Sequence, residues 1–385
     1  MTALRHGPGE LLTLIRSGEA TTRGELQRAT GLSRVTISRR LDALTDEGII
    51  RAAGTGSATG GRRPGTFAFH PDVVVLAATL DAVGGTTAVV TAQGRVLARG
   101  HVETSVEDGP ERTLALVSQA LRELAESTDI SPDRVMAVAI SVPGPTDPTD
   151  HRLNDPPIMP GWSGWPIVEH LRDEFGVPVY VENDADAMAY GEAFDGDAPP
   201  SSLVLVKVAA YIGAGIVVGN EVFRGAEGSA GDIGHVKVGG EALCRCGRTG
   251  CLAAEASGTA IAARLRAAGI EVHAISDIAE LAEAGNSTVL RELQRAGELI
   301  GSVVAAVVGI LNPATLVVAG ALACPPLVAA IRSAVYANSL PRATRHLEIR
   351  PSTFGDDAAI VGLATVAVND YYSPEAVNAR LDPED

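Results

Sequence analysis

The stretch CRCGRTGC, residues 244–251, holds three of the four cysteines in a chain of 385 residues. His235 lies nine positions before the first of them. Thiolate sulfur and imidazole nitrogen are ligands that zinc prefers, and a structural zinc site takes four of them. Gly247 and Gly250 permit the sharp turns that would bring three sulfur atoms together. The segment therefore predicts a zinc loop, residues 235–251, with the ligands His235, Cys244, Cys246 and Cys251.

The alternative for this cluster is a set of buried or redox-active cysteines. Four cysteines in a chain of this length form no disulfide framework, and a cytosolic cluster indicates metal binding or catalysis. Four protein ligands leave no position for water, so we predict a structural zinc ion and not a catalytic one. Cys324 stands alone in the sequence and is interpreted as a small buried residue.

The ends and apolar runs of the chain predict a soluble, cytoplasmic protein. The opening residues, MTALRHGPGE, fit neither a signal peptide nor a transit peptide. The longest apolar run, residues 302–311, is shorter than the about 20 residues that a membrane span needs. Apolar residues make up 46% of the chain, which is enough for large cores in two or three domains.

Charge is unevenly distributed along the chain. Residues 1–70 contain ten arginines, no lysine and six acidic residues, which gives this segment a net charge of +4. The whole chain has a net charge of −16, so residues 71–385 carry −20, which is −16 less the +4 of the first segment. This asymmetry predicts a small basic module attached to an acidic body. A basic module of that size indicates a nucleic-acid reader, although a solvated basic face is the simpler alternative.

The basic module has the pattern of a helix-turn-helix. Thr22 and Glu25 have the spacing of a capping box, Gly31 ends that helix, and Ser33 can cap the next one. The second helix has one apolar face, formed by Ile37, Leu41 and Leu44. We expect its other faces to contact DNA in the major groove through the residues Arg34, Thr36, Ser38, Arg39 and Arg40. An ordinary helical hairpin is the alternative.

A wing follows this second helix. The segment IIRAAGTGSATGGRRPGTFAFHPD, residues 49–72, reads as two strands around a glycine-rich tip. Arg62 and Arg63 in that tip suit a narrow minor groove, whereas a disordered linker is the alternative. Residues 1–70 are therefore predicted to form a winged helix-turn-helix DNA-binding domain.

The body, residues 71–385, is predicted to be α/β. Strands at 73–82 and 86–103 precede a helix at 110–127 and a buried strand running into a Pro-Gly loop at 134–145. A similar alternation of strands and helices recurs in the second half of the chain. Two α/β halves imply a cleft between them, a usual place for a small ligand.

Several segments resemble the ROK family (repressors, open reading frames and sugar kinases), over about residues 73–370. The segment GHVKVGGEALCRCGRTGC, residues 234–251, is similar to the zinc signature of that family. Four other segments also resemble family motifs: SVPGPTD (141–147), PPIMPGWSGWPI (156–167), VENDADAMAYGE (181–192) and LNPATLVVAGAL (311–322). The resemblance implies an actin-like, ribonuclease-H-like duplicated fold with two lobes, and the N-terminal winged helix is the arrangement of the family's regulators.

The resemblance also implies a set of sugar-contacting residues. These are Gly144, Asn183, Asp184, Asp232 and His235. Asp184 matches the general base of the kinases, although capping a helix is its simpler role. Asp232 stands where the family usually has a glutamate, and Ala253 stands where it commonly has another. Glu255, two positions further, would point away on a helix, so one sugar-binding carboxylate is predicted to be absent.

The phosphate-binding loops depart further from the family's kinases. At the first loop, Thr79, Asp81 and Ala82 replace an aspartate and two glycines, and an anionic Asp81 would repel phosphate. At the second loop, residues 209–211 read AAY in place of Gly-Thr-Gly, and Tyr211 would crowd a nucleotide. Both departures predict that ATP binding is lost and that Asp184 is a ligand contact.

The sequence therefore predicts a transcriptional regulator, most simply a repressor of carbohydrate genes. Its expected partners are operator DNA, a sugar or sugar-phosphate effector and further copies of itself as a dimer or tetramer, because paired half-sites need paired heads. The alternative is an ATP-dependent sugar kinase with a DNA-binding head. A third reading is a zinc-held scaffold that binds DNA without any effector.

Overall fold

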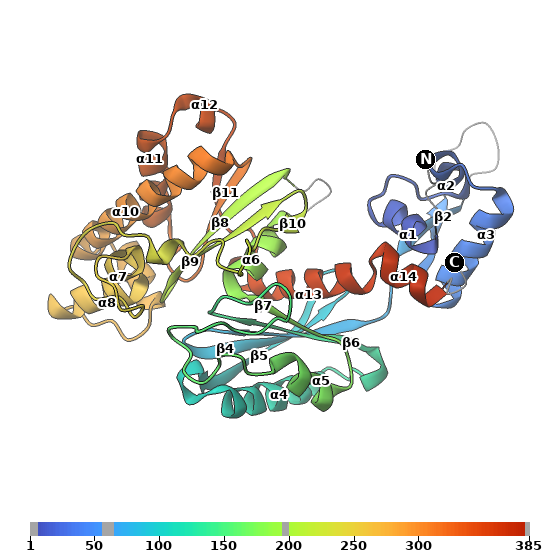
Figure 1. Ribbon diagram of the computed structural model, residues 1–385, viewed down its shortest axis with the longest axis horizontal. Helices are drawn as coiled ribbons and strands as arrows, with labels where there is room; N and C mark the ends of the chain where they lie inside the picture. The colour runs from blue at the N-terminus through green and yellow to red at the C-terminus, as the bar shows by residue number, and fades with distance from the viewer. Residues whose placement is uncertain (1–6, 56–64, 195–199, 382–385) are drawn as a thin grey trace.

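The computed structural model describes residues 7–55, 65–194 and 200–381 of the chain (Figure 1). These residues form a small N-terminal head and two α/β lobes. In Figure 1 the head lies at the right, the first lobe below and the second lobe at the upper left. The predicted fold class, a winged helix-turn-helix followed by a two-lobed α/β body, is confirmed.

The head is a winged helix-turn-helix. Its elements are α1 (Pro8–Arg16), α2 (Arg23–Thr30), α3 (Arg34–Asp46), β1 (Ile50–Thr55) and β2 (Gly65–Phe69). Thr22 and Glu25 form the expected capping box of α2, and Ser33 caps α3. The two strands pair antiparallel, as the wing requires. The predicted tip residues Arg62 and Arg63 lie outside the described residues.

Each lobe is built on a five-stranded sheet. The first sheet contains β3 (Val74–Leu80), β4 (Val83–Thr91), β5 (Val96–Ser105), β6 (Val135–Val142) and β7 (Val179–Asn183). The second contains β8 (Ser202–Val208), β9 (Ile212–Val218), β10 (Glu221–Val222), β11 (Thr315–Ala319) and β12 (Glu348–Pro351).

The two sheets share one topology. Their strand orders are β5-β4-β3-β6-β7 and β10-β9-β8-β11-β12. In both, three antiparallel strands come first along the chain, and two further strands then join in parallel beside the first of them. The repeated order confirms the predicted duplication.

Helices cover the outer faces of the sheets. On the first lobe these are α4 (Pro110–Ser127) and α5 (Ile167–Phe175), with the short turns η1 (Val106–Asp108) and η2 (Pro132–Arg134). On the second lobe they are α7 (Leu252–Ala256), α8 (Gly258–Ala267), α9 (Ser276–Glu283), α10 (Ser287–Leu311), α11 (Pro325–Asn338) and α12 (Pro341–Thr344), with η3 (Ile233–His235) and η4 (Gly355–Asp357).

Two buried helices lie between the sheets. α6 (Asp184–Ala193) packs on β8 and β9, and α13 (Ala358–Tyr371) packs on β3, β4 and β6. They cross closely at Gly191 and Gly362, because a Cβ atom on Gly362 would come within 1.7 Å of the Ala187 carbonyl oxygen. Only glycine permits this approach, so α6 and α13 form one tightly packed pair.

One helix among the described residues, α10, is long and apolar enough to cross a membrane by length and composition. Its glycines Gly297 and Gly301 pack against Ala330 and Ala334 of α11. Nine of its residues are buried in the second lobe, which is the environment of a core helix.

The last described helix, α14 (Pro374–Leu381), returns to the head (Figure 1). It packs on α1, and the Gly9 N–H donates to Asn378 Oδ1 at 2.7 Å. The ring of Phe69 at the end of the wing meets Tyr372 edge to face, with centroids 5.1 Å apart. The head is thus attached to both ends of the body and not only through residue 70.

Candidate functional site

A cleft of about 770 Å³ opens between the two lobes. Its walls come from the loop after β6, the first turn of α6, β8, the segment before η3 and the zinc loop. The structure brings all the predicted ligand-contacting residues to this cleft: Gly144, Asn183, Asp184, Asp232 and His235. Gly144, Asn183 and Asp184 converge because β6 and β7 are parallel neighbours whose carboxyl ends meet at one edge of the first sheet, and Asp232 and His235 face them from the segment around η3 of the second lobe.

Asn183 fixes the first turn of α6. Its Oδ1 accepts hydrogen bonds from the backbone N–H groups of Ala185 and Asp186, and its Nδ2 donates to the Gly144 carbonyl at 3.0 Å. Asn183 is therefore the N-cap of α6 and also ties the helix to the Pro-Gly loop. The capping role considered for Asp184 belongs to its neighbour.

Asp184 is held by a lysine that sequence reasoning missed. Lys207 on β8 donates from Nζ to Asp184 Oδ2 at 2.5 Å, and its Nζ lies 3.7 Å from Asp81 Oδ1. The Lys207 and Asp184 side chains are 13% and 10% exposed, so this ion pair is largely shielded from water. Burial alone would lower the pKa of Lys207, but the two carboxylates raise it above its ordinary value. The ammonium group thus stays charged and occupies the carboxylate that a general base would need.

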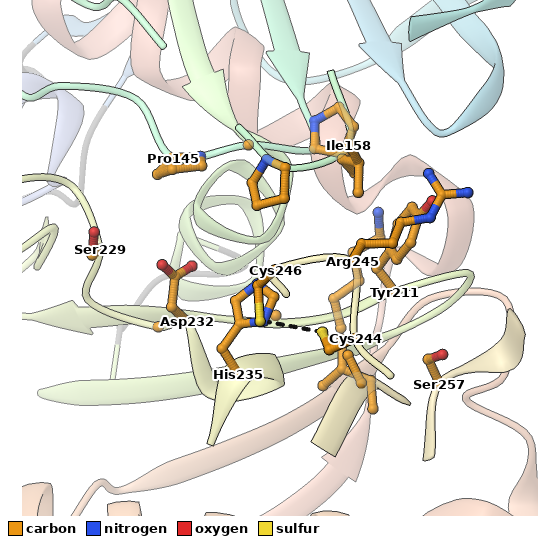
Figure 2. A pocket seen from close by; sticks show the side chains of 18 of the residues that line it. Pro145, Ile158, Tyr211, Ser229, Asp232, His235, Cys244, Arg245, Cys246 and Ser257 are labelled. Atoms are coloured by element: carbon orange, nitrogen blue, oxygen red, sulfur yellow. Dashed lines mark hydrogen bonds between the residues drawn. The ribbon is translucent and has the colours of Figure 1, made fainter. Parts of the chain in front are cut away.

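The four predicted metal ligands come together at the opposite wall. The ligand atoms of His235, Cys244, Cys246 and Cys251 all lie within 4.8 Å of one another. Cys246 Sγ and Cys251 Sγ are 3.7 Å apart, and Cys244 Sγ lies 3.6 Å from His235 Nδ1 (Figure 2). A tetrahedral zinc ion with Zn–S bonds of about 2.3 Å separates its sulfurs by about 3.8 Å. The donor set and its spacing therefore fit a metal ion such as zinc.

The loop is folded so that its sulfurs converge. Gly247 and Gly250 have the left-handed φ angles 84° and 72° that the sequence predicted. Burial and hydrogen bonds from the other two thiols raise the pKa of Cys251 to about 11. Three thiolates are thus unfavourable together without a cation, which is the charge that a bound metal supplies. Cys324, at the start of α11, lies outside the group.

Glu255 does not take the place of the carboxylate that the sequence lacks at Ala253. Ala253 lines the cleft, whereas Glu255 points away and pairs with Arg295 of α10 at 2.8 Å. Glu255 is 8% exposed and does not contribute to the cleft wall. The orientation of Glu255 agrees with the sequence spacing, and the loss of a sugar-binding carboxylate stays a prediction.

The side of the cleft opposite Asp232 is crowded by Tyr211 and Arg245 (Figure 2). The Arg245 guanidinium lies 5.8 Å from the centroid of the Tyr211 ring and donates to Glu107 Oε1 at 2.8 Å. Glu107 belongs to η1 of the first lobe and Arg245 to the zinc loop of the second. This ion pair therefore bridges the two lobes at the Tyr211 side of the cleft.

The residues of α3 that are predicted to contact DNA differ in their exposure. Arg34 and Arg39 are exposed, and Thr36 and Ser38 are half-buried. The prediction for Arg40 was wrong about its exposure, because Arg40 is only 8% exposed. It lies three residues after Ile37, and residues three apart share a helix face, so the helical period places it toward the core.

Val35 was overlooked in the sequence. It is 79% exposed at the start of α3, where an apolar side chain gains nothing from the core. The signal was its position between Arg34 and Thr36, outside the apolar period of the helix. An exposed valine there can contact a thymine methyl group in a major groove.

Comparison with known proteins agrees with both parts of the chain. Residues 81–370 match the sequence model of the ROK family, and residues 10–51 match that of winged helix-turn-helix DNA-binding domains. The xylose repressor of Bacillus spizizenii is 25% identical over 94% of this chain and 94% of its own length. The glucokinase of Halalkalibacterium halodurans is 29% identical over 73% of this chain and 91% of its own length.

One solved structure covers almost the whole molecule. It is a ROK family transcriptional regulator, a homologue of the E. coli MLC protein, with a TM-score of 0.80 and 24% identity over 96% of this chain and 97% of its own. At that identity the likeness concerns the fold, which includes the head, the two lobes and their order. Because the ROK family model matches more than half of the sequence, this chain belongs to the ROK family.

Proposed function

We propose that this protein is a cytoplasmic DNA-binding transcriptional repressor of carbohydrate genes, controlled by a sugar or sugar derivative bound in the cleft. The observation that carries the proposal is the pairing of a winged helix-turn-helix with a ROK cleft whose would-be catalytic carboxylate, Asp184, is ion-paired to Lys207. The xylose repressor, similar over 94% of both chains, supports the same function.

DNA binding is assigned to α3 and the wing. Arg34 and Arg39 can pair with phosphates or with guanine, while Thr36, Ser38 and Val35 can contact base edges. Arg62 and Arg63 are assigned to the adjacent minor groove on the sequence alone. Two heads are needed for a two-fold symmetric operator, so the active species is a homodimer or a homotetramer.

The effector is assigned to the cleft at Gly144, Asn183, Asp184, Asp232 and His235. A zinc ion held by His235 and the three clustered cysteines would play a structural role, because four protein ligands complete its tetrahedron. That ion would fix the orientation of His235 and the course of the loop that forms one cleft wall. The effector acts by binding one arrangement of lobes and head more tightly than another.

Kinase activity is the second candidate, and the glucokinase relative favours it. Three features of the cleft weigh against it: the Lys207–Asp184 pair, the carboxylate of Asp81 and the bulk of Tyr211. A kinase needs an unoccupied base near the attacking hydroxyl and backbone N–H groups around the phosphates. The structure of this cleft favours binding without phosphoryl transfer.

The deciding experiment is a binding titration of the purified protein against labelled DNA flanking its own gene. It is made at fixed salt, with and without D-xylose, D-glucose, D-glucosamine and the corresponding sugar phosphates. Sequence-selective binding that one sugar changes is the expected result. Selective binding that no sugar changes would leave a constitutive DNA binder, the third reading of the sequence.

A coupled assay with ATP, Mg²⁺ and the same sugars tests the kinase alternative. We expect turnover no higher than that of an Asp184→Asn variant. Turnover that this variant abolishes would overturn the assignment of Asp184 as a ligand contact.

A further inference from the structure

A cluster of carboxyl groups surrounds the first turn of α6. Glu182 at the end of β7, Asp184 and Asp186 in α6, and Asp232 before η3 all lie in it. Two of them have a cation as partner, since Lys207 pairs with Asp184 and Arg224 contacts Glu182 through Nη2 at 2.6 Å. Asp186 has no such bond. Its Oδ1 is buried and has no hydrogen-bond partner among the described residues.

The position of Asp186 is fixed by its surroundings. The residue is 4% exposed, its backbone N–H is bonded to Asn183, and its neighbours Ala185 and Ala187 are buried. The Asp186 side chain is therefore largely shielded from bulk water. It nevertheless lines the cleft, two residues along α6 from Asp184. An acceptor that is shielded from water and has no hydrogen-bond partner loses its hydration without gaining a protein hydrogen bond in exchange.

We propose that Asp186 determines effector specificity, and that its carboxyl group accepts a hydrogen bond from an O–H or N–H donor of the bound sugar. This inference rests on the proposed function, because it gives a further contact to the same effector. It extends the contact set beyond Asn183 and Asp184 to the inner end of the cleft. When the Asp186 side chain turns its carboxyl group toward the cleft that the residue lines, a ligand donor there would supply the hydrogen bond that Oδ1 does not make within the described residues.

The charges around Asp186 agree with this role. Burial, and then the carboxylate of Glu182, raise the pKa of Asp186 well above its usual range, and the guanidinium of Arg224 opposes them. Asp184 and Asp232 raise it further. The chain thus retains a destabilising carboxyl group, and a stability cost of this kind is common where a residue serves binding.

The first test needs no ligand and compares Asp186→Asn with the wild type. The amide keeps the size of the side chain and removes the buried acid, so we expect the melting temperature to rise by about 2 °C. An acid whose pKa is raised by folding makes the folded state less stable as pH rises through that range. The gain should therefore be larger at pH 8 than at pH 5, with Glu182, Asp184, Asp232 and Arg224 unchanged.

The second test measures binding. D-xylose, D-glucose and D-glucosamine are titrated by calorimetry into the wild type, Asp186→Asn and the control Asp173→Asn, an exposed carboxylate on α5 outside the cleft lining. We expect the sugar that binds the wild type to bind Asp186→Asn at least about tenfold more weakly, and the control to bind normally. Comparison of D-glucosamine with D-glucose distinguishes an N–H from an O–H donor.

The outcomes separate this inference from the function on which it rests. Equal affinity of the wild type and Asp186→Asn for a sugar that binds would overturn the role of Asp186 and leave the sugar-controlled regulator in place. If no sugar binds the wild type, the effector assignment fails. A melting temperature of Asp186→Asn at or below that of the wild type would overturn the inference without any ligand.

Discussion

At the scale of single residues, the main feature of the cleft is the Lys207–Asp184 ion pair. In a sugar kinase the corresponding aspartate would have to accept a proton from the substrate, but here its Oδ2 already accepts from an ammonium group at 2.5 Å. The same ammonium lies near Asp81 of the first lobe and therefore links the lobes. Burial raises the pKa of Asp184, and the charge of Lys207 opposes that rise.

Replacing Lys207 with methionine should lower the free energy of unfolding. The variant leaves the buried Asp184 without its cation, and loss of one partner from a buried pair costs about 3–5 kcal/mol. Urea denaturation measures the free energy of unfolding of the wild type and of each variant. The matched control is the double variant Lys207→Met with Asp184→Asn, which should recover much of the loss. A change of less than about 0.5 kcal/mol in the single variant would show that the pair does not stabilise the fold.

The pH dependence of this pair has a defined sign. Neighbouring carboxylates raise the pKa of Lys207 above its ordinary 10.5, so the contribution of the pair is fully present below that pH. It is lost only as pH rises further, through the folded-state pKa. Wild-type stability should thus show a loss above about pH 10.5 that the Lys207→Met variant lacks, and a pair contribution that already falls between pH 7 and 9 would contradict this.

Most site residues could be predicted from the sequence, but not their partners. The clustered cysteines, the Asn183–Asp184 pair and the absent carboxylate at Ala253 were visible because each belongs to a short local pattern. Lys207 was not, because a single lysine in a strand usually faces solvent and its partners come from distant segments. The prediction for Arg40 was wrong for a different reason. A charged residue suggests a solvent-facing position, but the helical period places Arg40 on the same face as Ile37.

At the scale of elements, the zinc loop and the recognition helix follow from local rules. The loop is placed by its left-handed glycines, and α2 and α3 are placed by their caps. The repeated sheet could be expected only as two α/β halves, since strand order depends on pairings between residues far apart in the chain. The packing of α14 on the head had no local signal at all.

Metal analysis should find one zinc ion per chain. Chelation, or the variant Cys246→Ser, should remove it and lower the melting temperature, because the loop from His235 to Cys251 loses the bonds that hold its sulfurs together. The control is Cys324→Ser, a buried cysteine outside the cluster, which should keep the full zinc content. Full zinc content in Cys246→Ser would show that this cysteine is not a ligand.

DNA affinity should depend on the exposed arginines of α3. Arg34→Ala and Arg39→Ala should each weaken binding at all sequences and lower the salt slope by about 1 if the arginine contacts a phosphate. Val35→Ser should change sequence preference with little effect on that slope. Fluorescence anisotropy at several salt concentrations measures both. Arg172→Ala, on exposed α5 of the first lobe, is the control, and an equal loss in it would contradict the assignment to α3.

At the scale of the whole molecule, α6, whose first turn lines the cleft, is joined to the head by a short series of hydrogen bonds. α6 begins in the cleft, and near its other end Tyr190 accepts a hydrogen bond from Asn369 of α13. Asn369 in turn accepts from Arg16 of α1 at 2.5 Å. These hydrogen bonds and the close crossing of α6 and α13 connect the cleft to the head. We expect a shift of the cleft walls to move the head through this route of contacts.

Removing the middle of that route should uncouple the two sites. Asn369→Ala should leave DNA affinity within about twofold of wild type and reduce the change that the effector causes in it, because coupling is a free energy separate from either affinity. Anisotropy titrations with and without the active sugar measure the coupling. An unchanged effector response in the variant would place the coupling elsewhere.

The attachment of the head by α14 is open to a direct test. Val377 is fully buried against the head, so Val377→Asp should release α14 and lower the hydrogen-exchange protection of α1. Protection of the two lobes should not change. The control is Ala379→Asp on the exposed face of the same helix. Equal protection of α1 in Val377→Asp and wild type would show that the head is stable without α14.

The contact between Gly9 and Asn378 joins residues 369 positions apart, and it has a consequence for how the protein is made. The ribosome completes α1, α2 and α3 early, but α14, which fixes α1 to the body, is synthesised only after both lobes. Domains can fold during synthesis in order from the N-terminus, so the DNA-reading part can form well before it is anchored. A prematurely terminated product would carry the head without the helix that anchors it to the body.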